Sequence, residues 1–328
     1  MIRNKAIVLS AWLFLSLVIL SGVSIFLGSA NLQWQEVLRA FCFLGDDATI
    51  SSILWQIRVP RLVLAILIGS SLALAGAIMQ SLFRNPLADP SITGVSSGAA
   101  LGAVVYISLV SQFSFGIQIF AFIFGMLAYF CVYMLGTKGS KASTLSLLLA
   151  GIAINAFCGA VVAFFMYTVR DIGLRGFIFW SLGSLNFASW QEIIPALVIN
   201  ICIFLFMIFK ANTLNLMLLG EQQAYYSGVN VKKMQFIFAG SAASLTAIAV
   251  ALCGIISFVG LVIPHIVRMI VGADNRKVLP ISTLAGANLI VLADIISRGY
   301  NPTDPVPIGV ITAFIGAPFF AYILKSKR

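Results

Sequence analysis

Ten apolar segments follow one another along this chain, with few polar residues between them. A helix needs about 20 residues to cross the hydrocarbon core of a bilayer, and most of the segments reach that length. They cover residues 6–27, 62–82, 93–111, 115–135, 145–168, 190–209, 235–255, 258–271, 279–297 and 307–324. The eighth is short and contains Pro264, so we expect a broken or tilted helix there. The pattern predicts a bundle of membrane-spanning helices.

The composition indicates that lipid is the solvent for most of the chain. Of its 328 residues, 61% are hydrophobic and 9% are charged, whereas about 25% are charged in a soluble domain. We therefore predict an all-α integral membrane protein with one transmembrane domain over residues 1–328. The first segment follows Arg3 and Lys5, as in a signal peptide, but its apolar run is too long, so we expect a retained helix.

The net charge of +10 does not indicate nucleic-acid binding, because the basic residues lie between the apolar segments and form no basic face or tail. Ten spans place both termini on one side of the membrane. If that side is the cytoplasm, fourteen basic residues are inner and six are outer, as the positive-inside rule requires. The inner set is Arg3, Lys5, Arg84, Lys138, Lys141, Lys210, Lys232, Lys233, Arg268, Arg276, Lys277, Lys325, Lys327 and Arg328; the outer set is Arg39, Arg58, Arg61, Arg170, Arg175 and Arg298.

Small residues recur at close spacing in two of the segments. The second carries Gly69, Ala73 and Gly76, and the third carries Gly98 and Gly102. Small residues four apart let two helix backbones approach closely in lipid. Close packing is the plainer interpretation, and lining of a wide pathway is the alternative.

No sequence motif supplies an energy source. A phosphate-binding Gly-x-x-x-x-Gly-Lys-Ser/Thr loop is absent. Asp294 is the one acid well inside a span, and Arg298, one helical turn later, is expected to pair with it. The missing carboxylate pairs argue against a secondary transporter, and the lack of clustered His, Asp and Glu argues against a membrane-embedded enzyme. Another protein is therefore expected to drive this one.

Neither a metal site nor a disulfide framework is predicted. The five cysteines, which are Cys42, Cys131, Cys158, Cys202 and Cys253, show no CxxC spacing and are expected to be packing residues. His265, the only histidine, is expected to be packed and hydrogen-bonded.

Several motifs carry a more specific signal. They are RNPLADP at 84–90 with GVSSGA at 94–99, FVGLVIPH at 258–265, and PIGV at 307–310 with GAPF at 316–319; WQIRVPR at 55–61 and LLLAG at 147–151 fit as well. Together they resemble the permeases of bacterial ATP-driven (ABC) importers for ferric siderophores, haem and vitamin B12. The resemblance runs from about residue 50 to the C-terminus.

The resemblance implies a type II ABC importer permease fold with ten helices. It also implies a homodimer around a central pathway, two cytoplasmic ATPase subunits below it and a periplasmic substrate-binding protein above it. The location implied is the bacterial inner membrane. The chain itself is then a transport subunit and not an enzyme, has no permanently bound cofactor, and relies on ATP used by the partner subunit.

The resemblance assigns Arg58, Arg61 and Arg298 to a periplasmic rim that receives carboxylates from the binding protein. Basic residues on the outer side run against the positive-inside bias, so they need a reason. Arg–carboxylate contacts would steer docking and fix its register. Ordinary snorkelling at the membrane interface is the alternative.

The resemblance also assigns two cytoplasmic elements. The polar stretch at residues 221–230 corresponds to paired short helices that enter a cleft of the ATPase, and it is longer than an ordinary connector. A solvated loop is the alternative. The coupling residues implied are Glu221, Gln222, Ala224, Gly228 and Val229. The resemblance also implies an inner gate formed by Asn85, Leu87, Ser143 and Thr144. The alternative to a gate is a stiff inner turn.

The ligand is the least constrained feature. Arg175, shortly before FWSLGSL at 179–185, is expected to line the outer funnel and attract anionic groups such as haem propionates. Together with LGE at 219–221, this stretch is closer to haem and ferric-siderophore permeases than to the vitamin B12 branch. We therefore favour haem, then a ferric siderophore, and keep vitamin B12 as the alternative.

Overall fold

The computed structural model describes residues 2–28, 33–41, 48–109, 116–138, 141–142, 144–168, 171–186, 188–301 and 304–326. These residues are helices and connections, apart from one antiparallel hairpin of two-residue strands, β1 (Thr137–Lys138) and β2 (Lys141–Ala142). The predicted all-α class is confirmed.

Seven helical stretches in the described ranges are long and apolar enough to cross a membrane, and three shorter apolar helices accompany them. The long ones are α1 (Ile2–Phe26), α4 (Val59–Leu82), α6 (Gly116–Gly136), α7 (Thr144–Thr168), α9 (Trp190–Phe209), α12 (Val231–Cys253) and α14 (Asn275–Tyr300); the shorter ones are α5 (Val95–Leu109), α13 (Val259–Val271) and α15 (Ile308–Ser326). Each of the ten predicted segments lies on one of these helices. The short eighth segment is α13, which remains helical through Pro264.

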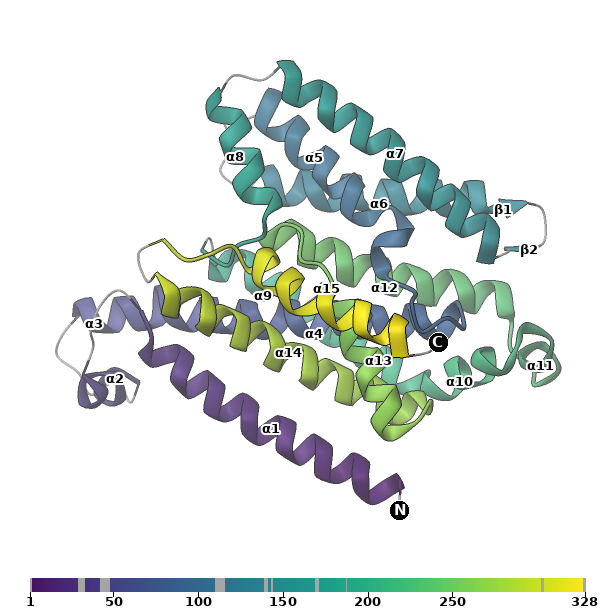
Figure 1. Ribbon diagram of the computed structural model, residues 1–328, viewed down its shortest axis with the longest axis horizontal. Helices are drawn as coiled ribbons and strands as arrows, with labels where there is room; N and C mark the ends of the chain where they lie inside the picture. The colour runs from purple at the N-terminus through teal and green to yellow at the C-terminus, as the bar shows by residue number, and fades with distance from the viewer. Residues whose placement is uncertain are drawn as a thin grey trace.

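Short helices mark the two ends of the bundle. They are α2 (Trp34–Phe41), α3 (Ala48–Ser52), the π-helical turn η1 (Ile53–Arg58), the 3-10 turn η2 (Pro90–Thr93), α8 (Asp171–Ser181), α10 (Ala211–Leu219) and α11 (Glu221–Tyr226). We name the two ends of the molecule after α2 and α11, which lie at opposite ends in Figure 1. Both chain termini lie toward the α11 end, as an even number of spans requires.

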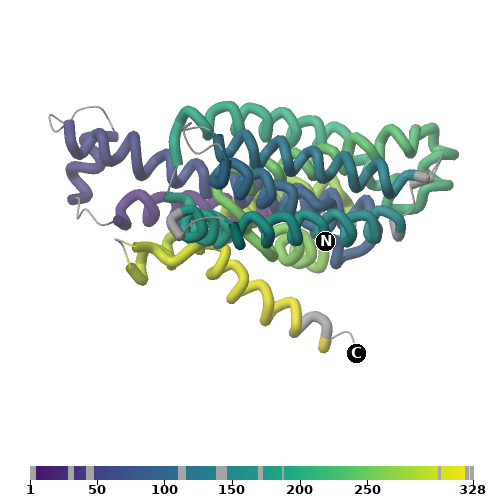
Figure 2. Tube along the Cα trace, turned by 90° about the horizontal axis from the view of Figure 1, so that it is seen from above, coloured from purple at the N-terminus to yellow at the C-terminus, as the bar shows by residue number. Residues whose placement is uncertain are grey.

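The helices fall into two groups around α12. In Figure 1, α5, α6, α7 and α8 lie together on one side of α12, while α4, α13, α14 and α1 lie on the other. On the first side, Ala239, Ala243 and Ala247 of α12 pack with Val95 and Tyr129. Figure 2 shows α15 diverging from the rest of the bundle.

Helix α4 lies at the centre of the second group, and glycines set its distance from its neighbours. A methyl group built on Gly69 would overlap the backbone of Gly286 in α14, and one built on Gly76 would overlap the backbone of Gly260 in α13. The backbones therefore touch directly, as small residues permit in lipid. At these positions the predicted small-residue pattern serves close packing, not the lining of a pathway.

Serine–asparagine hydrogen bonds join other helix pairs inside the bundle. Ser71 of α4 donates to Asn200 of α9, and Ser97 of α5 donates to Asn155 of α7. Ser16 of α1 donates to Asn288 of α14. Such bonds add on the order of 1 kcal/mol each between helices in lipid and fix which faces meet.

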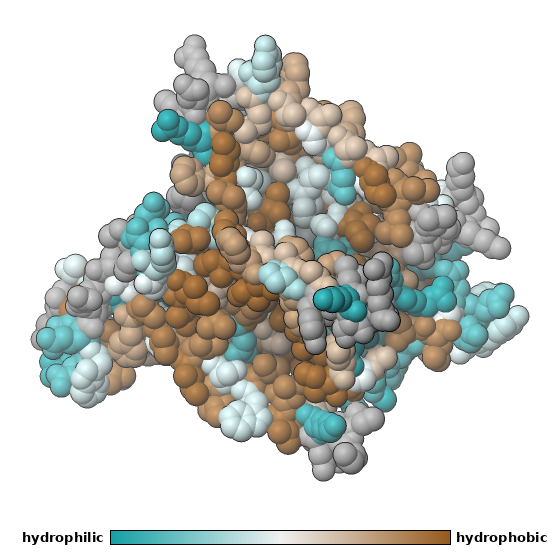
Figure 3. Space-filling view, viewed as in Figure 1, coloured by the Kyte–Doolittle hydropathy of each residue, from teal (hydrophilic) through white to brown (hydrophobic). Residues whose placement is uncertain are grey.

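The outer surface matches a membrane environment. Figure 3 shows a broad apolar surface over the middle of the bundle, with hydrophilic residues gathered over α2 and α3 at one end and over α10 and α11 at the other. Large apolar side chains such as Trp12 and Phe209 are 67% and 82% exposed. Contact with lipid, not burial, accounts for such side chains.

Replacing Gly76 with alanine should destabilise the protein, because the new methyl group meets backbone atoms of Gly260 that cannot move aside. We expect a loss of about 1–3 kcal/mol, typical of overpacking, seen as a lower melting temperature of the purified protein in detergent. Gly22→Ala in α1 is the matched control, because no atom lies within 4 Å of the added methyl group. Equal melting temperatures for the two variants would refute the tight contact.

Candidate functional site

The three arginines predicted for the rim do come together, at the α2 end of the bundle. Residues 55–61, expected to lie in an outer connection, are helical instead: Ala48–Leu82 is one continuous helical stretch, in which Pro60 stands where the π-helical turn η1 passes into α4. This brings Arg58 and Arg61 beside the end of α14, which carries Arg298.

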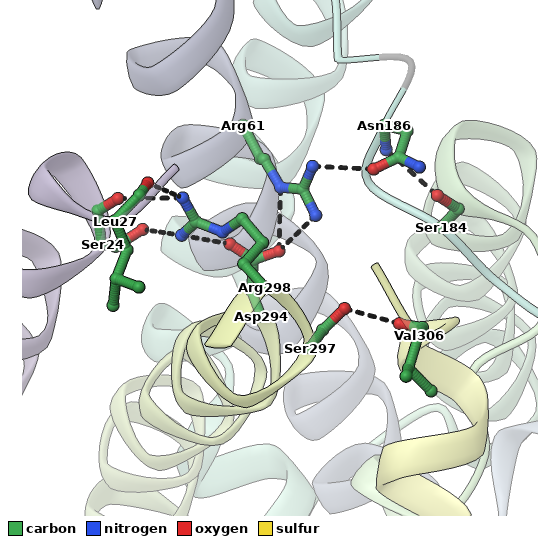
Figure 4. Close-up of polar contacts among 9 residues, drawn as sticks. All are labelled: Ser24, Leu27, Arg61, Ser184, Asn186, Asp294, Ser297, Arg298 and Val306. Atoms are coloured by element: carbon green, nitrogen blue, oxygen red, sulfur yellow. Dashed lines mark hydrogen bonds and ion pairs between the residues drawn. The ribbon is translucent and has the colours of Figure 1, made fainter. Parts of the chain in front are cut away.

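Asp294 lies between two of these arginines (Figure 4). The Arg61 Nε donates to Asp294 Oδ1 at 2.9 Å, and an Arg61 terminal nitrogen lies 2.8 Å from the same oxygen. A terminal nitrogen of Arg298 lies 2.6 Å from Asp294 Oδ2. The Asp294 side chain is 0% exposed. The predicted Asp294–Arg298 pair is therefore present, and Arg61 is an additional partner. We call Arg61, Asp294 and Arg298 the outer ion cluster.

Arg58 and Arg298 also bind the last carbonyl groups of α1. Arg298 donates to the carbonyl oxygens of Ser24 and Leu27 at 3.0 and 2.7 Å, and Arg58 donates to that of Ile25 at 2.6 Å. The last turn of a helix has carbonyl groups without intrahelical partners and a partial negative charge, so cations are favoured there. The two arginines therefore fix the end of α1 to η1 and α14.

This geometry limits what the rim can offer a docking partner. Arg58 and Arg298 are 6% and 5% exposed, and their guanidinium groups already have acceptors. The Arg61 side chain, at 14% exposure, is less covered and reaches Asn186 Oδ1 at 2.7 Å. The rim role stays a prediction for all three arginines, and Arg61 is the best placed of them.

An apolar groove lies beside Arg61 on the same end. It has a volume of about 350 Å³ and is lined by Phe179, Trp180, Ser184, Asn186, Leu252, Cys253, Asp304, Pro305, Val306 and Pro307. Arg175 is exposed on α8, one helical turn before Phe179, which is 65% exposed. Residues four apart share a helix face, so Arg175 and Phe179 together present a cation and an aromatic ring.

At the opposite end, α10 and α11 form a pair of short helices joined by Gly220. Gly220 has φ of 137°, a backbone conformation that glycine adopts most easily. The predicted polar stretch began at residue 221, whereas the first helix of the pair begins at Ala211. Its sequence, ANTLNLMLL, is mostly apolar and reads as a continuation of the preceding span.

The predicted coupling residues divide by exposure. Glu221, Gln222 and Gly228 are exposed, Val229 is partly covered, and Ala224 is 0% exposed. Ala224 belongs to an apolar cluster that also contains Met79, Leu214 and Val267. An open groove of about 850 Å³ runs beside the exposed residues; it is lined by Glu221, Gln222, Tyr225, Tyr226, Gly228, Val229, Asn230, Val231, Lys232 and Gln235.

The predicted gate is described in part. Asn85 is exposed; its Oδ1 accepts from the Leu87 N–H at 2.9 Å, and its carbonyl accepts from Ala88 at 3.1 Å, so residues 85–88 form a closed turn. Ser143 lies outside the described residues. Thr144 begins α7, but its side chain is also outside them.

The described residues contain no group of three or more His, Cys, Asp or Glu side chains that could hold a metal ion. His265 is buried in α13, and Cys131, Cys158, Cys202 and Cys253 are free thiols. Asp274, in the connection before α14, has its pKa lowered to about 2, chiefly by hydrogen bonds from the Arg276 side chain, so it is ionised at any physiological pH.

Comparison with known proteins gives consistent matches along the chain. The FecCD transport family matches residues 15–326. The chain is 41% identical to a cobalamin import system permease of Halobacterium salinarum, over 92% of this chain and 81% of the relative. It is 39% identical to a hemin transport system permease of Yersinia pestis, over 96% of both. A solved structure of a chain assigned as a metal-chelate type ABC transporter, in an inward-facing conformation, is similar with a TM-score of 0.86 at 31% identity, over 97% and 98% of the two chains.

Replacing Asp294 with asparagine should destabilise the protein strongly. The change leaves Arg61 and Arg298 without their buried counter-ion, and breaking a buried pair in this way costs about 3–5 kcal/mol. The melting temperature in detergent measures the effect. Asp304→Asn, the same change at an exposed position of the same end, is the control. An Asp294→Asn protein as stable as the control would contradict the outer ion cluster.

Proposed function

The chain belongs to the FecCD transport family, and we propose that it forms one half of a homodimeric pathway through which an ATP-driven importer moves an iron complex into the cytoplasm. The chain is an ABC importer permease, of the family whose members serve iron chelates, haem and vitamin B12. The family match over nearly the whole chain carries the proposal. Such a permease works with an ATPase partner and a substrate-binding protein.

The α11 end is proposed to face the cytoplasm. Described basic residues at this end include Arg84, Lys210 and Lys232, and the bias of Lys and Arg toward the cytoplasm favours this orientation. Both termini then lie in the cytoplasm, since both are directed to this end. The membrane proposed is the bacterial inner membrane.

The α10–α11 pair is proposed to dock on the ATPase. It exposes Glu221, Gln222, Tyr225 and Tyr226 beside an open groove, while Ala224 anchors it in the apolar cluster. Exposed tyrosines next to a rigid anchor are typical of protein interfaces. This supports Glu221, Gln222, Ala224, Gly228 and Val229 as the coupling residues.

The α2 end is proposed to receive the binding protein. Arg58, Arg61 and Arg298 lie near one buried carboxylate, Asp294, so positive charge exceeds negative charge within this group of four side chains, even though the guanidinium groups are engaged. A local excess of this kind favours a partner's carboxylate that comes close to Arg61. Within this arrangement Arg61 contacts the partner, and Arg58 and Arg298 support it.

The inner gate is proposed to involve the turn at residues 85–88 together with Ser143 and Thr144. Pro86 and Pro90 restrict the backbone, and the Asn85–Leu87 bond closes the turn. A stiff turn of this kind can open and close by moving with the helix before it, α4.

Haem is the cargo we favour, with a ferric siderophore next and vitamin B12 as the alternative. Arg175 and Phe179 at the outer end offer a cation and an aromatic face, which suit a planar ring system with carboxylate edges. Sequence identity does not separate the alternatives, because the vitamin B12 and haem relatives differ by only two percentage points, 41% against 39%.

A photo-cross-linking amino acid at Gln222 should capture the ATPase subunit in membranes that contain the whole transporter, because Gln222 is exposed on the docking pair. The same amino acid at Asp304, exposed at the other end, should capture the binding protein. Immunoblots for the two partners read the result. Each position is the control for the other, and capture of the ATPase from Asp304 would reverse the proposed orientation.

Haem should stimulate ATP hydrolysis by the reconstituted complex, in the presence of the binding protein, more than a ferric siderophore or vitamin B12 does. If vitamin B12 stimulates ATP hydrolysis and haem does not, the proposal of haem as cargo is wrong and vitamin B12 is the cargo.

Replacing Arg175 with glutamine should raise the haem concentration needed for half-maximal uptake by about tenfold, since a charge-assisted hydrogen bond contributes about 1.5–3 kcal/mol. Arg39→Gln, the same change at another exposed arginine of the α2 end, is the control and should leave haem uptake unchanged.

A further inference from the structure

A second polar cluster lies inside the α11 end, and neither docking nor gating residues account for it. Arg268, in the last turn of α13, donates to the Ala77 carbonyl of α4 at 2.9 Å and to Asn275 Oδ1 of α14 at 3.1 Å, and it also contacts the Ser81 hydroxyl. Ser81 in turn donates to Asn275 at 2.7 Å. We call Ser81, Arg268 and Asn275 the polar joint; it ties together the ends of three helices.

The polar joint continues into α10. The backbone N–H of Asn275 donates to Asn215 Oδ1, and Asn215 Nδ2 donates to Asp274 Oδ1, both at 2.8 Å. Asp274 also caps α14 by accepting from the Arg276 N–H at 3.1 Å. Because Asp274 stays ionised, this connection holds at every physiological pH. The Asn215 side chain of α10 is thus bonded to Asp274 and Asn275, and Asn275 is also the residue that accepts from Arg268.

The two helix ends tied by this chain of bonds lead to different functional segments. Helix α10 leads through Gly220 into α11, and α4 leads directly into the turn at residues 85–88. Helix α11 and the turn at residues 85–88 also share one apolar cluster, which contains Ala224 of α11 and Ala88 of the turn. Arg84, at the start of the turn, lies beside Gly220.

The polar joint is not arranged for stability alone. Among the described residues, Arg268 Nε and Asn275 Nδ2 are buried without a hydrogen-bond partner. A partly satisfied buried network is less stable than apolar side chains of similar volume. Because Arg298 Nε in the outer ion cluster is also buried without a hydrogen-bond partner in the described part of the chain, what distinguishes the polar joint is the pair of segments that it connects.

We propose that Arg268 is a positioning residue of the transport cycle, which with Ser81 and Asn275 makes the end of α4 move together with α10. Movement of the α10–α11 pair is then passed to the turn at residues 85–88 through bonded, closely packed contacts. This inference rests on the proposed function, in which the pair docks on the ATPase and the turn gates the pathway.

Spin labels test the inference in the complete transporter, assembled with its ATPase in nanodiscs. One sample carries the label at Tyr226 and another at Leu87, and the distance between the two copies of the label is measured with and without ATP. In the wild type both distances should change with ATP. In Arg268→Met the change at Tyr226 should persist and the change at Leu87 should be lost. Haem taken up per ATP hydrolysed should fall at least about fivefold, as expected for a coupling free energy.

Controls separate positioning from folding. Arg268→Lys keeps a donor in reach of α4 and should restore most of the Leu87 change, whereas Lys5→Met, the same type of change at an exposed position of α1, should leave both distances as in the wild type. If Arg268→Met does not assemble, Ser81→Ala, which removes one hydroxyl, takes its place. A full Leu87 change in the assembled variant overturns the proposal. If the distance at Tyr226 in the wild type does not change with ATP, the proposed function is overturned, and so is the role proposed for the polar joint.

Discussion

The close approach of α4 to α13 and α14 is the constraint on which the rest of this structure depends. Gly69 meets Gly286 and Gly76 meets Gly260, so three backbones touch where lipid provides no hydrophobic force to press them together. Dispersion between closely fitted backbones replaces that force. Once these contacts form, the two ends of α4 and α14 are held near each other, and polar side chains at either end can pair.

The two ends use this proximity in different ways. At the α2 end, Asp294 is a fully buried charge with two counter-ions, and the same arginines bind the end of α1. At the α11 end, the polar joint connects onward to α10 through the Asn275 N–H and the Asn215 side chain. The first arrangement fixes helix positions. The second joins segments proposed to move.

Residue spacing predicts much of the fold but little of the polar pairing. Each apolar segment carries its own evidence for a spanning helix, because bilayer thickness is a local constraint on length. The Asp294–Arg298 pair is also local, one helical turn apart, and was predictable for that reason. The Arg61–Asp294 bond, by contrast, joins residues 233 positions apart, so no spacing rule could find it. Likewise, α10 looks like part of the preceding span, because its burial against the bundle demands the same apolar residues.

The burial of Arg58 and Arg298 changes how the proposed docking role must be understood. Sequence alone treats Arg58, Arg61 and Arg298 as equal positions on an outer surface, since all three run against the positive-inside bias. In the structure they differ: Arg58 and Arg298 satisfy carbonyl groups at the end of α1, and Arg61 keeps a partly exposed guanidinium beside Asn186. A partner's carboxylate that reached Arg58 or Arg298 would have to displace acceptors already in place, and would gain little in exchange. Their remaining contribution is the positive potential that they add beside Arg61, which salt screens, whereas a direct bond to Arg61 would be screened less. Docking through this rim should therefore depend on ionic strength more than a set of three direct ion pairs would.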